Sequence, residues 1–68
     1  MVDTREYYCK DFQTADGIGL IADLHNVKCY IRGDYHIIKI EQELDGITHH
    51  QFANYINCIT AIEDFIRE

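Results

Sequence analysis

Histidine and cysteine are the residue types of this chain that could bind a metal ion or act as nucleophiles. The sequence holds four histidines and three cysteines, at Cys9, Cys29 and Cys58. Zinc sites draw their ligands from closely spaced pairs. The nearest approach, His25 and Cys29, spans a predicted turn and strand, and His49-His50 point to different sides of a predicted helix start. We therefore expect neither a metal site nor a cofactor.

Catalytic motifs are equally scarce. The chain has no serine, which removes a Ser-His-Asp triad. The segment Gly17-Ile18-Gly19 is too short for a phosphate-binding loop. The odd number and wide spacing of the cysteines argue against a disulfide framework, so we expect them to be reduced and mostly buried. The sequence therefore predicts a protein that is not an enzyme.

Length and composition bound the fold. The chain has 68 residues, 47% of them hydrophobic, and its 12 acids against 6 Lys and Arg give a net charge of −6. A chain of this size forms one domain, here residues 1–68, with a single thin core. Its apolar runs fall far short of the roughly 18 residues that span a bilayer, and its start has no signal-peptide pattern. We expect a cytoplasmic protein in a reducing compartment, with no membrane contact.

Two segments in the middle of the chain predict a β-hairpin. Residues 27–32 and about 35–44 both alternate apolar and polar side chains, and Gly33-Asp34 between them suits a two-residue turn. That turn would pair Cys29 with Ile38. Because directly opposed residues share a face, it gathers the core side chains on one face, namely Val27, Cys29, Ile31, Ile38 and Ile40.

Two further strands are predicted upstream. Residues 18–24 can pair with the hairpin through a second two-residue turn at His25-Asn26, which places Leu24, Ala22 and Leu20 on the same core face. A first strand over about residues 5–12 would put a charged side chain inside the core in either register. We therefore expect it at an edge of the sheet.

A helix is predicted over about residues 49–67. Thr48 and Gln51 form a capping box at its start, flanked by Ile47 and Phe52 as a hydrophobic staple. The predicted fold is a two-layer α+β arrangement, in which an antiparallel β-meander of three to four strands has one face covered by this C-terminal helix (β-β-β-β-α).

The uncovered face of that sheet is the first candidate site. In the predicted register Ile21, Tyr30 and Ile37 lie side by side across three strands. Tyrosine and cations beside exposed apolar area are typical of protein interfaces, although strand propensity alone also explains such residues. The predicted open sheet face consists of Ile21, Lys28, Tyr30, Arg32, Tyr35, Ile37 and Lys39.

Acidic residues form the second candidate site. Residues 41–68 hold six carboxylates and one arginine, a net charge of −5. Carboxylates on a small scaffold can imitate phosphates and occupy a basic groove of a nucleic-acid-binding enzyme, and they also serve solubility alone. The predicted acidic end consists of Glu41, Glu43, Asp45, Glu63, Asp64 and Glu68.

Together these features favour a small acidic protein-binding module without catalytic activity. In size and charge it resembles the acidic inhibitors and regulators encoded by phages and mobile elements, which act by occupying a partner's surface. The alternative is a homodimeric subunit or an antitoxin-like regulatory component. Binding of single-stranded nucleic acid through the open face is less favoured, because residues 18–40 carry only +1.

Overall fold

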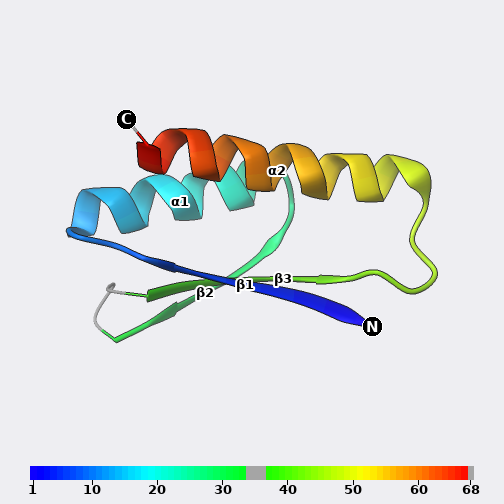
Figure 1. Ribbon diagram of the computed structural model, residues 1–68, viewed down its shortest axis with the longest axis horizontal. Coiled ribbons are helices and arrows are strands. Elements are labelled where there is room, and N and C mark those ends of the chain that lie inside the picture. The colour runs from blue at the N-terminus through cyan, green and yellow to red at the C-terminus, as the bar shows by residue number, and fades with distance from the viewer. Residues whose placement is uncertain (34–36, 68) are drawn as a thin grey trace.

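The computed structural model describes residues 1–33 and 37–67 and shows an α+β protein with two layers (Figure 1). The α+β class with an antiparallel sheet is confirmed, but the sheet has three strands and the helical layer has two helices. Neither helix in these two ranges combines the length and apolar character that a membrane span requires. In chain order the elements are β1 (Val2–Tyr8), α1 (Phe12–Leu24), β2 (Lys28–Arg32), β3 (Ile37–Glu43) and α2 (His49–Arg67).

The sheet has the strand order β1-β3-β2, and β3 pairs antiparallel with both neighbours. Consequently β1 and β2 run parallel to each other, with β3 inserted between them. This is a split βαβ arrangement, and the element order follows the first five elements of the ferredoxin-like order β-α-β-β-α-β. Both helices lie on the same side of the sheet (Figure 1). The other side has no covering element within the described residues.

The predicted strand over residues 18–24 is wrong, because these residues belong to α1. Ala15, Ile18 and Ala22 are fully buried, and their spacing of three and four residues is that of one helix face. Leu20 and Leu24 are apolar but exposed. Together with Ile18 and Ala22 they place an apolar residue at every second position, which resembles a strand.

The predicted turn at His25-Asn26 is the C-terminal end of α1. Asn26 has a positive φ of 57°, the left-handed conformation that ends many helices. Its N–H donates to the Asp23 carbonyl at 3.0 Å, and the Val27 N–H donates to the Ala22 carbonyl at 2.9 Å. This pair of hydrogen bonds is a Schellman motif, which turns the chain from α1 into β2.

The hairpin of β2 and β3 forms in a register shifted by two residues from the prediction. Cys29 pairs with Ile40 rather than with Ile38, and Arg32 pairs with Ile37. A shift of two leaves every side chain on its predicted face, because side chains alternate with a period of two. Ile38 and Ile40 are accordingly fully buried.

The first strand lies at an edge, as expected, but covers Val2–Tyr8 rather than residues 5–12. It pairs with β3 and not with the next segment of the chain. The sheet is therefore not a meander, since α1 separates the first two strands in sequence.

Helix α2 agrees with its predicted bounds and cap. The Thr48 N–H donates to Gln51 Oε1 at 2.9 Å, and the Gln51 N–H donates to Thr48 Oγ1 at 3.1 Å. Its buried face carries Tyr55, Cys58, Ile59 and Ile62. These side chains complete a single core with Ile38, Ile40 and the buried face of α1.

The two helices contact each other at Gly17 of α1. A Cβ atom at this position would lie 2.3 Å from Cζ of Phe65 in α2, so a larger residue would force the aromatic ring to shift. A Cβ atom at Gly19, two residues further along α1, would have no neighbouring atom within 4 Å. The two glycines therefore have different roles, although both lie in the same helix.

Alanine substitution at the two glycines should have opposite consequences. Gly19→Ala should raise the free energy of unfolding by about 0.5–1 kcal/mol through helix propensity alone. Gly17→Ala gains the same propensity but displaces Phe65, which costs about 1–2 kcal/mol of buried apolar contact. Urea denaturation should rank Gly17→Ala below Gly19→Ala by more than 1 kcal/mol, a size typical of such packing losses. Equal stability of the two variants would contradict this role of Gly17.

Candidate functional site

The face of the sheet turned away from the helices is built from alternate residues of all three strands. Because Ile38 and Ile40 face the core, Ile37, Lys39 and Glu41 of β3 face outward with the residues paired to them. Three rows cross this open face from β1 to β2. They are Tyr8-Ile37-Arg32, Glu6-Lys39-Tyr30 and Thr4-Glu41-Lys28.

Most of the residues predicted for this face lie together on it. Lys28, Tyr30, Arg32, Ile37 and Lys39 form one contiguous surface on β2 and β3. Two predicted members are not placed there. Ile21 lies in α1, where it packs against the core on the other side of the sheet, because its segment is helical. Tyr35 lies outside the described residues.

The sequence prediction missed the three residues that β1 contributes to these rows, Thr4, Glu6 and Tyr8. Tyr8 is 78% exposed beside Ile37, and Glu6 lies opposite Lys39. Both belong to β1, whose pairing with β3 joins residues 29 to 41 positions apart in the chain. Alternation within β1 marks a strand, but it does not reveal which strand is its neighbour.

The rows of the open face hold three cations and two carboxylates, and two of the cations lie in ion pairs. Arg32 contacts Glu6 at 3.5 Å, and Lys39 contacts Glu41 at 2.9 Å. The cations predicted to border the apolar residues are therefore interleaved with carboxylates. Phosphate binding relies on several unneutralised cations, and two of the three cations in these rows are paired with carboxylates.

The predicted acidic residues do not form one surface. Glu41, Glu43 and Asp45 lie at the end of β3, whereas Glu63 and Asp64 follow the start of α2 by 14 or more residues. At a rise of 1.5 Å per residue this separation is about 21 Å. Glu68 lies outside the described residues.

Several of these carboxylates already have partners. The Met1 ammonium group contacts Glu43 at 2.9 Å and also contacts Asp45, and the first contact lowers the pKa of Glu43. Glu63 lies 3.9 Å from Arg5, and Asp64 lies 3.8 Å from Arg67. These contacts reduce the negative charge available to a basic partner.

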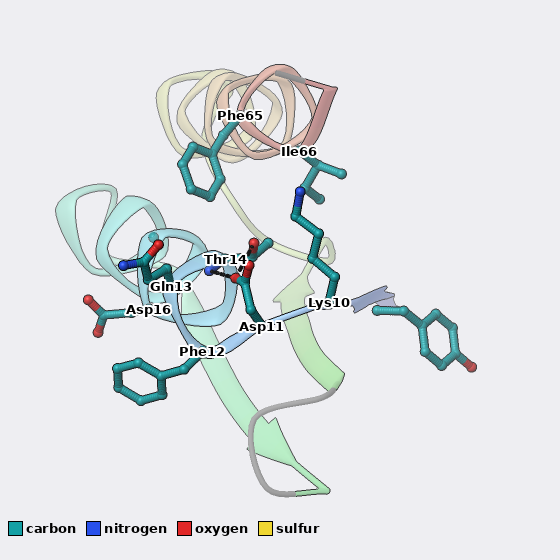
Figure 2. Close-up of a pocket in the computed structure, with 10 residues that line it drawn as sticks. Lys10, Asp11, Phe12, Gln13, Thr14, Asp16, Phe65 and Ile66 are labelled. Carbon is teal, nitrogen blue, oxygen red and sulfur yellow. Dashed lines mark hydrogen bonds between the residues drawn. The ribbon is translucent and has the colours of Figure 1, made fainter.

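A surface groove of about 660 Å³ lies between the start of α1 and the end of α2 (Figure 2). Asp11 caps α1 there, accepting hydrogen bonds from the Thr14 N–H at 2.8 Å and from Thr14 Oγ1 at 2.7 Å. These bonds lower the pKa of Asp11. A carboxylate at the helix N-terminus occupies the position that an anionic ligand would take, so the groove offers no anion site.

Cys9 and Cys58 are buried, and Cys29 is half-buried. All are free, and burial raises the pKa of Cys9, Cys29 and Cys58. A raised pKa keeps the thiol protonated and weakly nucleophilic. Within residues 1–33 and 37–67, no three His, Cys, Asp or Glu side chains are arranged to hold a metal ion.

A polar cluster fastens β1 to α2 beneath the helices. The Tyr55 hydroxyl donates to Asp3 Oδ2 at 2.5 Å, and Arg5 Nε donates to the same oxygen at 3.1 Å. These bonds lower the pKa of Asp3, with Tyr55 the larger cause. Burial and the bond to Asp3 raise the pKa of Tyr55 to about 12. The Tyr7 hydroxyl is buried nearby without a hydrogen-bond partner among the described residues.

Comparison with known proteins gives no match to a protein-family model, to a curated protein or to a solved structure. The functional conclusion therefore depends on the surfaces described above.

The bond between Tyr55 and Asp3 should make stability depend on pH at both extremes. The folded pKa of Asp3 lies below its ordinary value of 3.8, so its contribution is present above that pH and is lost as the pH falls through the depressed pKa. Tyr55 has a raised pKa, so its contribution is lost as the pH rises from 10.0 to about 12.

Tyr55→Phe should lower the free energy of unfolding near neutral pH by about 1–2 kcal/mol, as expected for a hydrogen bond to a charged group. It should also flatten the loss of stability on both sides. Tyr8→Phe is the matched control, because Tyr8 is exposed on the opposite face. Chemical denaturation over a pH series measures both effects. Parallel pH profiles for wild type and Tyr55→Phe would show that the bond contributes nothing.

Proposed function

We propose that the protein is a small, non-catalytic protein-binding module that contacts another protein through the open face of its sheet. The observation that carries this proposal is the uncovered face itself, on which Tyr8, Ile37 and Tyr30 lie beside three cations. Tyrosine and arginine contribute most often to the energetic centres of protein interfaces. The module would act as a regulator or inhibitor by occupying its partner's surface.

The chemistry of this face supports a protein partner over a nucleic acid. Tyr30 is 45% exposed on an edge strand, and the outward residues of the central strand β3 include no aromatic side chain. Single-strand binders stack bases on aromatic side chains within a positively charged groove. Charges of alternating sign suit the complementary pattern of a specific protein interface instead.

The acidic residues are the weaker candidate for partner contact, because they are divided between two ends of α2 and are largely engaged in ion pairs. A partner with a basic groove would meet only part of the acidic set at one time. A reducing, cytoplasmic setting is part of the proposal, since the free cysteines suit that compartment.

Affinity capture from the native host with two matched variants tests the proposal. Ile37→Glu places a charge on the central strand of the open face, pointing away from the core, whereas Ile56→Glu alters a half-exposed position on α2. The expected result is a captured protein whose affinity, measured by calorimetry after purification, falls about tenfold or more with Ile37→Glu. Ile56→Glu should bind like wild type.

Two results would contradict the proposal. One is a captured protein that binds wild type and Ile37→Glu with equal affinity, which would locate the contact elsewhere. The other is salt-sensitive binding of a single-stranded oligonucleotide that Ile37→Glu abolishes, which would assign the face to nucleic acid.

A further inference from the structure

The layer of helices is wider than the sheet beneath it. Two helices side by side occupy about 20 Å, because each is about 10 Å across with its side chains. Three strands of about 4.8 Å each occupy only about 14 Å. Helix α2 is fastened to β1 through Tyr55 and Asp3. Helix α1 lies beside α2 and therefore projects past β2 at the other edge.

This overhang leaves an apolar groove along β2. The groove has a volume of about 440 Å³, and its apolar lining includes Leu20 of α1 and Ile31 of β2. Leu20 is 58% exposed and Ile31 is 52% exposed, although Ile31 faces the helical layer. Gly19 borders the groove with open space above its Cα atom. One more strand beside β2 would cover these side chains.

The two edges of the sheet differ in the chemistry of their helix-facing residues. On β1 these residues include Asp3 and Arg5, which bond to each other and to α2. Charged side chains turned inward protect an edge strand from pairing with other chains. On β2 the corresponding residues are Cys29 and Ile31, which carry no charge. The β2 edge is therefore the one that can accept a strand.

We infer that the β2 edge binds the β2 edge of a second copy of this chain. The two copies would be related by a two-fold axis perpendicular to the sheet, which makes the paired strands antiparallel and keeps all helices on one side. The sheets would join into one of six strands. Leu20 and Ile31 of each copy would meet their counterparts under the overhanging helices.

The charges of β2 select the register of this pairing. Centred on Tyr30, the pair would place Lys28 opposite Arg32 of the other copy, and directly opposed like charges destabilise a sheet. Centred on Ile31, it places Ile31 opposite Ile31 on the helical side. On the open face it then places Tyr30 opposite Arg32, a favourable cation–π arrangement. The dimer is thus centred on Ile31, and the open faces of the two copies form one continuous surface.

The β1 edge does not compete for the same position. Its helix-facing Asp3 and Arg5 would lie against the apolar groove and would have to give up their bonds to α2. A contact between β1 and β2 would also repeat without closing and would yield filaments. Two exposed carboxylates, Asp16 and Asp23, border the groove. Salt that screens them should strengthen the dimer.

Sedimentation equilibrium over a range of concentrations tests the inference with two matched variants. Ile31→Lys and Val2→Lys replace β-branched residues that are 52% and 51% exposed, on the β2 and β1 edges. Wild type should form a reversible dimer. Ile31→Lys should raise the dissociation constant of the dimer by about a hundredfold, since each dimer loses two central side chains. Val2→Lys should leave it unchanged.

Disulfide trapping tests the register separately and does not require the substituted dimer to be as stable as wild type. Ile31→Cys should form a covalent dimer under mild oxidation, because its two copies face each other across the axis. Val2→Cys should not. The inference is overturned if wild type stays monomeric at millimolar concentration. It is also overturned if Val2→Lys rather than Ile31→Lys disperses the assembly, or if only Val2→Cys forms the covalent dimer.

Discussion

The packing of the Phe65 ring against Gly17 joins the two helices that form one layer of the molecule. Because Gly17 has no Cβ atom, the ring lies directly against α1, and both helices cover the same face of the sheet. Ile38 and Ile40 of the central strand are fully buried in the core that both helices share with the sheet. The same arrangement places no element on the other face and lets α1 extend beyond β2. The core thus lies between the helices and the sheet, and both candidate interfaces lie outside it.

The two edges of the sheet contact the helices in different ways. At β1 the helical side is closed by hydrogen bonds and charges, with Tyr55 fully buried against Asp3. At β2 the helical side borders an open apolar groove instead. One edge is bonded to α2, and the other is the edge at which we infer the dimer.

Much of the C-terminal half could be predicted from local sequence signals. The capping box at Thr48 and Gln51 fixed the start of α2, and alternation assigned the faces of β2 and β3 correctly despite a register shift of two.

Helix α1 was missed because its exposed Leu20 and Leu24 interrupt the helical pattern and imitate a strand. Asp11 with Thr14 marks a helix start, and it was the available signal. Leu20 also lines the proposed interface. An apolar residue that serves an interface lies outside the core, so it disturbs a pattern that is based on burial. Tyr8 and Glu6 could not be assigned to the open face, because their position depends on long-range pairing.

Amide hydrogen exchange as a function of protein concentration tests the central claim most directly, with the β1 edge as an internal reference. The backbone N–H groups of Lys28–Arg32 that point away from β3 should exchange quickly in dilute solution and slowly at high concentration. The corresponding N–H groups of Val2–Tyr8 should exchange at one rate throughout. That result would show that β2 is the edge completed by association. Equal rates at the two edges at every concentration would contradict the account.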